Sequence, residues 1–160
     1  MVYGTINRKG EKYYTHLNKV FRAIKSRQNN YNWLITDCEC YPKNSATAEM
    51  LKRDYCWLSG EELTALVEEE DFQWIWAVLS GFEKDIPFDK VIKYNLPYAD
   101  GYRDFWENPL TLQHPLASVE IVPWDSTLTL LLSKDKEIVE DFRKAFPYSE
   151  NLEGYNQNEL

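Results

Sequence analysis

Two amphipathic helices are predicted from the spacing of apolar residues. Over residues 11–27 the apolar side chains recur every three or four positions and fall on one side of a helix. Residues 134–146 repeat this spacing, and Pro147 closes the run. Each helix therefore has one apolar side to bury, and we expect both to pack on a sheet.

A third, shorter helix is expected over residues 60–69. Ser59 and Glu62 have the spacing of a capping box, in which each side chain accepts a hydrogen bond from the other residue's backbone N–H. Four consecutive acids follow at residues 68–71 and oppose the helix dipole. The helix is therefore expected to end near Glu69.

Six segments have the alternation, or the β-branched and aromatic content, of strands. Residues 72–79 are apolar on both faces, which is typical of a central strand. The last two strands are separated by a short turn and are expected to form an antiparallel hairpin. The six segments are residues 2–6, 31–41, 54–58, 72–79, 118–123 and 127–132. We therefore predict a single α+β domain over residues 1–150 with a mostly antiparallel sheet, followed by a polar tail over residues 151–160.

A long connection precedes the hairpin. It covers residues 82–116 and contains four prolines, and connections of this length are usually functional or mobile. Its aromatic residues are interleaved with acids, a combination that suits a protein-binding surface. The competing interpretation is that the rings cover one open face of the sheet.

The charges of the chain are unevenly distributed. The first thirty residues carry seven basic side chains and one acid, although the whole chain has 26 acids, 18 basic residues and a net charge of −8. This acidic total opposes nucleic-acid binding, which depends on clustered lysine and arginine. Two interpretations of the basic segment stay open. Its charges balance the acidic body of the protein, or they orient an approaching protein partner.

No cofactor site and no membrane segment are predicted. The glycines are isolated, so a phosphate-binding loop is not expected, and no G-x-S-x-G sequence marks a nucleophilic serine. The longest apolar stretch, residues 74–79, is far shorter than a membrane span. The first residues lack the apolar core of a secretion signal. We therefore expect a cytoplasmic protein.

Three cysteines are expected to be free thiols. In a regular strand Cys38 and Cys40 lie on the face opposite to Trp33, at a separation that disfavours a disulfide. A zinc site needs further ligands, and Cys56 and the two histidines are distant in the sequence. A nucleophilic Cys38 is disfavoured by its acidic neighbours, which raise the pKa of a thiol.

The end of the chain has a strand, a turn, a second strand and a helix. Its sequence runs through Val119-Glu-Ile-Val-Pro-Trp-Asp-Ser126, residues 130–135 and 139–147, and Asn151-Leu-Glu-Gly-Tyr155. This pattern resembles the ending of small bacterial proteins of unknown function, some of which are similar to immunity proteins of toxin systems. The resemblance implies a cytosolic protein that binds and blocks a partner, and it defines no functional residue.

The sequence therefore favours an acidic protein-interaction module whose partner is another, basic protein. Its most concrete form is immunity-type neutralisation of a basic toxin. The alternative is a small hydrolase or transferase with a pocket between the sheet and residues 82–116. No catalytic, cofactor-binding or metal-binding residue is predicted. The candidate partner-binding residues are the acids Glu68, Glu69, Glu70 and Asp71 and the aromatic residues Tyr98, Tyr102, Phe105 and Trp106.

Overall fold

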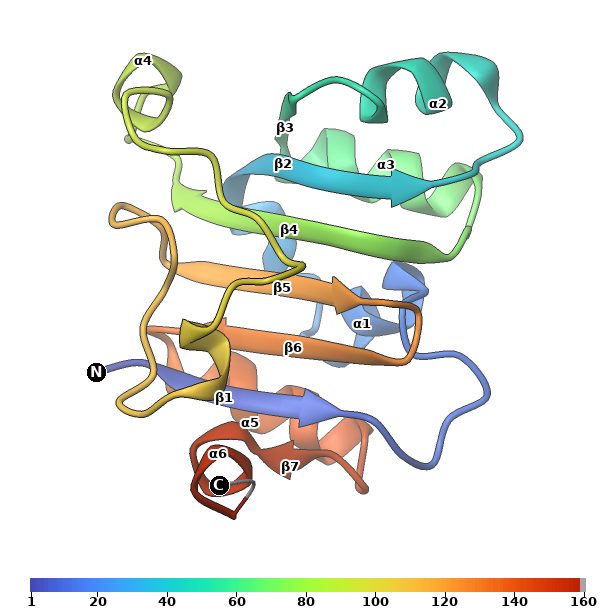
Figure 1. Cartoon of the computed structure of the whole chain (residues 1–160). Coiled ribbons are helices and arrows are strands. Elements are labelled where there is room, and N and C mark those ends of the chain that lie inside the picture. The colour runs from blue at the N-terminus through green and yellow to red at the C-terminus, as the bar shows by residue number, and fades with distance from the viewer. Residues whose placement is uncertain (159–160) are drawn as a thin grey trace.

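One seven-stranded sheet forms the centre of the protein. The computed structural model describes residues 1–158, and all its neighbouring strands pair antiparallel in the order β3-β2-β4-β5-β6-β1-β7 (Figure 1). The strands are β1 (Tyr3–Asn7), β2 (Tyr31–Cys40), β3 (Tyr55–Ser59), β4 (Trp74–Glu83), β5 (Val119–Trp124), β6 (Leu128–Ser133) and β7 (Glu150–Asn151). The predicted α+β fold with a mostly antiparallel sheet is confirmed.

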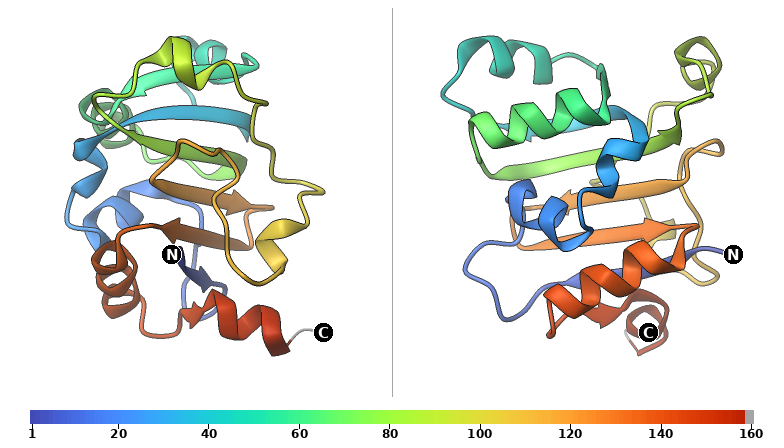
Figure 2. Two further views of the ribbon diagram at one scale, coloured as in Figure 1. Left: turned by 90° about the vertical axis from the view of Figure 1, so that its left-hand side faces the viewer. Right: turned by 180° about the vertical axis from the view of Figure 1, so that it is seen from behind.

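The two faces of the sheet are covered differently. Three helices, α1, α3 and α5, pack on one face of the sheet. The right-hand view of Figure 2 shows them in front of the sheet. The other face lies beneath the connection from β4 to β5 and, beside β1, beneath α6. The helices are α1 (Leu17–Ala23), η1 (Arg27–Asn30), α2 (Ser45–Leu51), α3 (Gly60–Glu69), α4 (Phe88–Val91), η2 (Asp104–Trp106), α5 (Lys136–Ala145) and α6 (Leu152–Asn158). Across residues 1–158, no helix has the length and apolar character needed to cross a membrane.

An apolar core fills each side of the sheet. Leu79 belongs to the core beneath the helices, and its neighbour Val78 belongs to the core on the opposite side. Strand β4 pairs with β2 along one edge and with β5 along the other. This position explains why its sequence is apolar on both faces, and it confirms the predicted central strand.

The helix predicted over residues 11–27 is wrong at its beginning. Helix α1 starts only at Leu17, because the preceding residues run extended beside the start of β4. Trp74 donates its backbone N–H to the carbonyl of Thr15 at 3.1 Å, and His16 forms an isolated bridge with Gln73. These backbone groups are thus satisfied by pairing between distant segments, which helical periodicity does not reveal.

The same helix also ends earlier than predicted. Ser26 donates its backbone N–H to Phe21 and Lys25 donates to Arg22, both at 3.0 Å, which is the pattern of a Schellman motif. Lys25 and Ser26 both have left-handed φ angles, of 58° and 61°. Glycine normally occupies such a position. Because no glycine is present here, the end of the helix could not be predicted from the sequence.

We predicted a polar tail over residues 151–160, of which the last two lie outside the described residues; residues 151–158 are not such a tail. Residues 150–151 form β7 against β1, and residues 152–158 form α6. Leu152 is fully buried, and its side chain packs in the same core as Ile6 and Leu130. One well-placed leucine thus anchors a segment whose remaining composition is polar.

Strand β2 contains a bulge that changes which face the cysteines occupy. Its pairing with β4 shifts between Thr36 and Glu39, and Asp37 has a φ angle of 51°. The extra residue reverses the alternation of the strand. Cys38 and Cys40 therefore pack on the same core as Trp33, on the face opposite to the one predicted.

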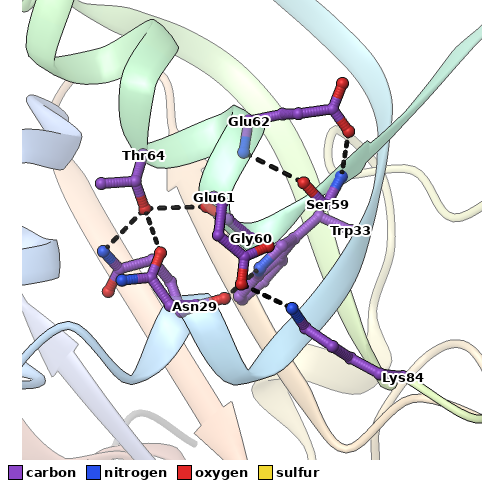
Figure 3. Close-up of polar contacts among 9 residues, drawn as sticks. Asn29, Trp33, Ser59, Gly60, Glu61, Glu62, Thr64 and Lys84 are labelled. Atoms are coloured by element: carbon purple, nitrogen blue, oxygen red, sulfur yellow. Dashed lines mark hydrogen bonds and ion pairs between the residues drawn. The ribbon is translucent and has the colours of Figure 1, made fainter.

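The N-terminus of α3 is both capped and closely packed. Ser59 and Glu62 form both hydrogen bonds of the predicted capping box, at 3.1 and 2.9 Å (Figure 3). The first residue of the helix, Gly60, lies directly against η1. A Cβ atom placed on Gly60 would stand 2.1 Å from the carbonyl oxygen of Gln28 and 2.7 Å from the Cα of Asn29.

Candidate functional site

Residues 92–118, here called the crossing segment, pass over the face of the sheet opposite to α1, α3 and α5 (Figure 1). Two side chains hold its middle by hydrogen bonds to its backbone. The carboxylate of Asp37, in the bulge of β2, accepts the N–H of Ala99 at 2.9 Å. The amide of Gln113 bonds both the N–H and the carbonyl of Tyr98, each at 2.9 Å. The segment is therefore an ordered cover, although it contains little regular structure.

The later part of the crossing segment is fixed by the buried carboxyl group of Glu120 on β5. Its Oε1 atom accepts the backbone N–H groups of Gln113 and His114. Burial raises the pKa of Glu120 to about 8, although these two hydrogen bonds act in the opposite direction. Glu120 is thus a group whose proton affinity differs strongly between the folded and the unfolded chain.

His114 is buried beside Glu120 and is held on both ring nitrogens. Its Nε2 lies 2.9 Å from the carbonyl of Val91, and its Nδ1 accepts the N–H of Leu116 at 3.1 Å. These partners assign the proton to Nε2 in a neutral ring. Burial also lowers the pKa of His114. With both nitrogens engaged, the imidazole serves as a structural anchor and has no free position for proton transfer to a substrate.

An enzyme of the alternative class would need a pocket between the sheet and this connection. A cavity of about 390 Å³ lies beside the bulge of β2, and one of about 270 Å³ is lined by residues of the crossing segment itself. The smaller cavity is lined by Tyr94, Asn95, Leu96, Tyr98, Tyr102, Gln113 and Pro115. Burial raises the pKa of Tyr102 to about 12, so its phenol stays protonated near neutral pH. Neither Glu120 nor His114 lines this cavity, so no acid–base pair converges on it.

The four aromatic residues predicted from the sequence lie together. Tyr98 contacts Tyr102 with ring centroids 5.4 Å apart, and Tyr102 contacts Phe105 at 4.6 Å. Trp124 on β5 links Phe105 to Trp106, at 6.3 and 5.0 Å. We call these five residues the aromatic row. Phe105 is fully buried and supports the row from within, whereas Tyr98 is 47% exposed.

Three aromatic residues of this surface were not among the four predicted. Trp124 comes from the hairpin. The ring of Trp76 on β4 lies 4.9 Å from the ring of Trp124, and the ring of Tyr155 on α6 lies 6.1 Å from that of Trp106. They come from segments that are far apart in the chain. Only the strand order, which single-sequence patterns leave undetermined, could have joined them to the crossing segment.

An acidic hollow lies at one end of the aromatic row. It has a volume of about 560 Å³, and its lining includes the indole of Trp106 and the two acids Glu107 and Glu153. Asn156 also lines it and is 5% exposed, with a side-chain oxygen that bonds no described group. Carboxylates beside an indole are suited to a lysine or arginine side chain, which can pair with the acids and lie on the ring.

In the predicted acidic run, Glu70 and Asp71 accept hydrogen bonds from the backbone of other segments. Glu70 accepts the backbone N–H groups of Lys43 and Asn44 at 2.7 and 3.1 Å, just before α2. Asp71 accepts the N–H of Asn18 at 3.4 Å and lies 3.5 Å from His16. Glu68 and Glu69 are exposed on α3. This helix covers the face opposite to the aromatic row, so the structure does not bring the two predicted groups together.

The division predicts different effects of two neighbouring substitutions. Glu70→Ala removes an acceptor of two backbone hydrogen bonds and should lower the free energy of unfolding by about 1–2 kcal/mol. Glu68→Ala should change it by less than about 0.5 kcal/mol, because Glu68 is on an exposed helix surface. Urea denaturation of both variants measures the difference. Equal effects would contradict the structural role of Glu70.

Five of the seven basic side chains in the first thirty residues form ion pairs within the protein. The guanidinium of Arg27 also lowers the pKa of Asp141 through its hydrogen bond. The pairs are Arg8 and Lys9 with Glu150, Lys19 with Glu11, and Lys25 and Arg27 with Asp141. Of the two interpretations of the basic segment, these pairs favour charge balance within the molecule.

Comparison with known proteins gives one match. Residues 5–153 match the family model described as Protein of unknown function (DUF2691). No curated protein and no solved structure matches the chain. Among the residues that the structure describes, no group of three histidine, cysteine, aspartate or glutamate side chains is placed to hold a metal ion. The match covers nearly the whole chain and agrees with the expected relation to proteins of unknown function. It does not rest on the C-terminal pattern, and it carries no indication of an immunity role. The chain belongs to the DUF2691 family.

Proposed function

We propose that this protein is an interaction module that binds a basic protein through the aromatic row and the acidic hollow beside it. The observation that carries the proposal is the hollow itself, where Trp106 lies with Glu107 and Glu153. A partner's lysine or arginine would lose its hydration on entering and would gain two carboxylates and a ring in return.

The surroundings of the hollow support the same kind of partner. Tyr98 and Tyr102 offer large rigid rings, which are typical anchors of protein interfaces. Asp100, between them in the chain, and Asp104, two residues after Tyr102, are both exposed acids. Such charges raise the association rate of a basic partner more than they raise its final affinity. Binding should therefore be fast at low salt and slower as salt is added.

Immunity-type neutralisation of a basic toxin is the most concrete form of this proposal. It requires the partner to be harmful when expressed alone and harmless when this chain is present. A protein that neutralises by binding needs a stable surface and no catalytic group. The anchoring of the crossing segment by Asp37, Gln113 and Glu120 is consistent with such a surface.

The proposal is tested by capture from the native host followed by mass spectrometry. Wild-type protein and Glu68→Lys/Glu69→Lys should retain the same basic protein, because the acids on α3 lie on the opposite face. Glu107→Lys/Glu153→Lys should lose it by at least about tenfold, which corresponds to 1.4 kcal/mol. Equal retention by both double variants would dismiss this surface.

Trp106→Ala and Tyr41→Ala form a second matched pair. Tyr41 is 73% exposed, outside the aromatic row, so its removal should leave capture unchanged. Trp106→Ala should reduce capture, and circular dichroism of each variant establishes that it is folded. If the captured protein inhibits growth when produced alone, co-production of this chain should restore growth. Persistent inhibition would exclude the immunity form.

A further inference from the structure

Two thiols are in contact near the end of β2. Cys38 and Cys40 are two residues apart and project to the same side of the strand, with their Sγ atoms 3.6 Å apart. The left-handed Asp37 before them turns both toward the core that contains Trp33. Both side chains are only partly buried. The third cysteine, Cys56 on β3, is 7% exposed and has no hydrogen bond to either of them.

The two thiols are not equivalent. One hydrogen bond joins them, and it lowers the pKa of Cys40 and raises that of Cys38. Cys40 is therefore the better thiolate, and Cys38 remains a thiol at its side. A low-pKa cysteine next to a second cysteine is the usual arrangement of a thiol that reacts and a thiol that resolves the product.

The pair can be reached from solvent. Both side chains are partly exposed, and Cys38 also lines the cavity of about 390 Å³ beside the bulge. This volume admits a molecule as small as hydrogen peroxide.

We propose that Cys38 and Cys40 are a redox-active dithiol, which hydrogen peroxide converts into an intramolecular disulfide. The thiolate of Cys40 attacks one peroxide oxygen, the O–O bond breaks, and the departing hydroxide takes up a proton to become water. Cys40 is then a sulfenic acid. The sulfur of Cys38 attacks it, the S–O bond breaks, and the released hydroxide leaves as water with the proton of Cys38. Two thiols lose two electrons, and one peroxide becomes two molecules of water.

Formation of the bridge requires a small local adjustment. Residues two apart in an extended strand have Cα atoms roughly 6.6 Å apart, near the upper end of the range found in disulfides. The bulge already departs from a regular strand at this point. The thiols pack on the face of the sheet opposite to the aromatic row, although Tyr98 of that row also lines the cavity beside the bulge. The disulfide is detected directly, so its formation is tested separately from partner binding.

The test treats folded protein with hydrogen peroxide, blocks the remaining thiols, and maps the peptides by mass spectrometry. Wild type and the matched control Cys56→Ser should both give the Cys38 to Cys40 disulfide, which dithiothreitol should reverse. Cys38→Ser should lose this product and accumulate a sulfenic acid on Cys40 that dimedone traps. Cys40→Ser should lose both products. Near-ultraviolet circular dichroism identifies any variant that has lost its fold.

Three results would overturn the proposal. The first is that both thiols of folded wild-type protein stay reduced under conditions that oxidise glutathione. The second is oxidation directly to sulfinic acid without a disulfide. The third is a bridge that involves Cys56. Since wild type and Cys56→Ser decide the main point, the proposal stays testable even if the other two variants fold poorly.

Discussion

Replacing Gly60 by alanine is expected to lower the free energy of unfolding by about 3 kcal/mol, although alanine is normally the better residue in a helix. The added methyl would stand 2.1 Å from the carbonyl oxygen of Gln28 and 2.8 Å from that of Tyr31. These obstacles are backbone atoms and cannot turn aside as a flexible side chain would. The start of α3 would have to move away from η1.

The movement would also affect the contacts around this helix end. Thr64 accepts a hydrogen bond from Gln28 at 3.0 Å and donates to Asn29 at 2.7 Å, which ties the first turns of α3 to η1. The indole N–H of Trp33 bonds the same Gln28 carbonyl at 2.9 Å. Separation of the two elements would weaken both Thr64 bonds. Any shift of η1 would also disturb the bond from Trp33, one of the largest fully buried side chains.

Gly154→Ala is the matched control for this substitution. Gly154 also lies near the start of a helix, α6, but its nearest neighbour for an added Cβ is the side-chain oxygen of Asn151 at 3.7 Å. This variant should gain about 0.5–1 kcal/mol, as alanine does where space allows. Urea denaturation measures both variants. If Gly60→Ala is also neutral or stabilising, the close contact between α3 and η1 is wrong.

The local features of the fold were predictable from the sequence because short segments encode them. The capping box of Ser59 and Glu62 depends on residues three apart, and it begins α3 where expected. The apolar stripe and closing proline of residues 134–146 likewise predicted α5. Even within the helix that was predicted too long, Leu17 and Val20 are buried on the side that the periodicity indicated.

The remaining features depend on contacts between distant segments. Residues 11–16 lie outside the helix, with Thr15 and His16 paired beside the start of β4. Leu152 orders the C-terminal segment only because a core is present beneath it. The bulge at Asp37 contains no glycine that would have predicted it, and it places Cys38 and Cys40 on the face of the sheet opposite to the predicted one. Local propensity is overridden in each case by tertiary packing.

The candidate site was predicted in the same partial way. The aromatic residues of the crossing segment are close in sequence, so their gathering could be expected. The hollow, by contrast, combines Glu107 with Glu153 of α6, which the sequence analysis had assigned to a tail. Glu120 was one acid among 26, and only its place on the central part of the sheet, beneath the crossing segment, distinguishes it.

Glu120 should make the protein less stable as the pH rises through neutrality. Its pKa is raised by burial to about 8 in the folded chain, whereas an unfolded glutamate titrates near about 4.3. Between these values the folded chain holds a proton that the unfolded chain has released. Stability therefore falls by about 1.4 kcal/mol per pH unit across this window, and the favourable contribution is complete only below it.

Glu120→Gln should remove this dependence. The amide oxygen of glutamine can still accept the N–H groups of Gln113 and His114, but no charge can form. The stability of the variant relative to wild type should therefore grow by about 3 kcal/mol between pH values of about 5 and about 8. Urea denaturation of both proteins across this pH range measures the difference. Protonation of His114 in acid also lowers stability, but this contribution is common to both proteins. Glu68→Gln, on an exposed surface, should give a constant difference. A constant difference for Glu120→Gln as well would show that the carboxyl group is ionised in the folded protein and that the crossing segment is held by a charged acceptor.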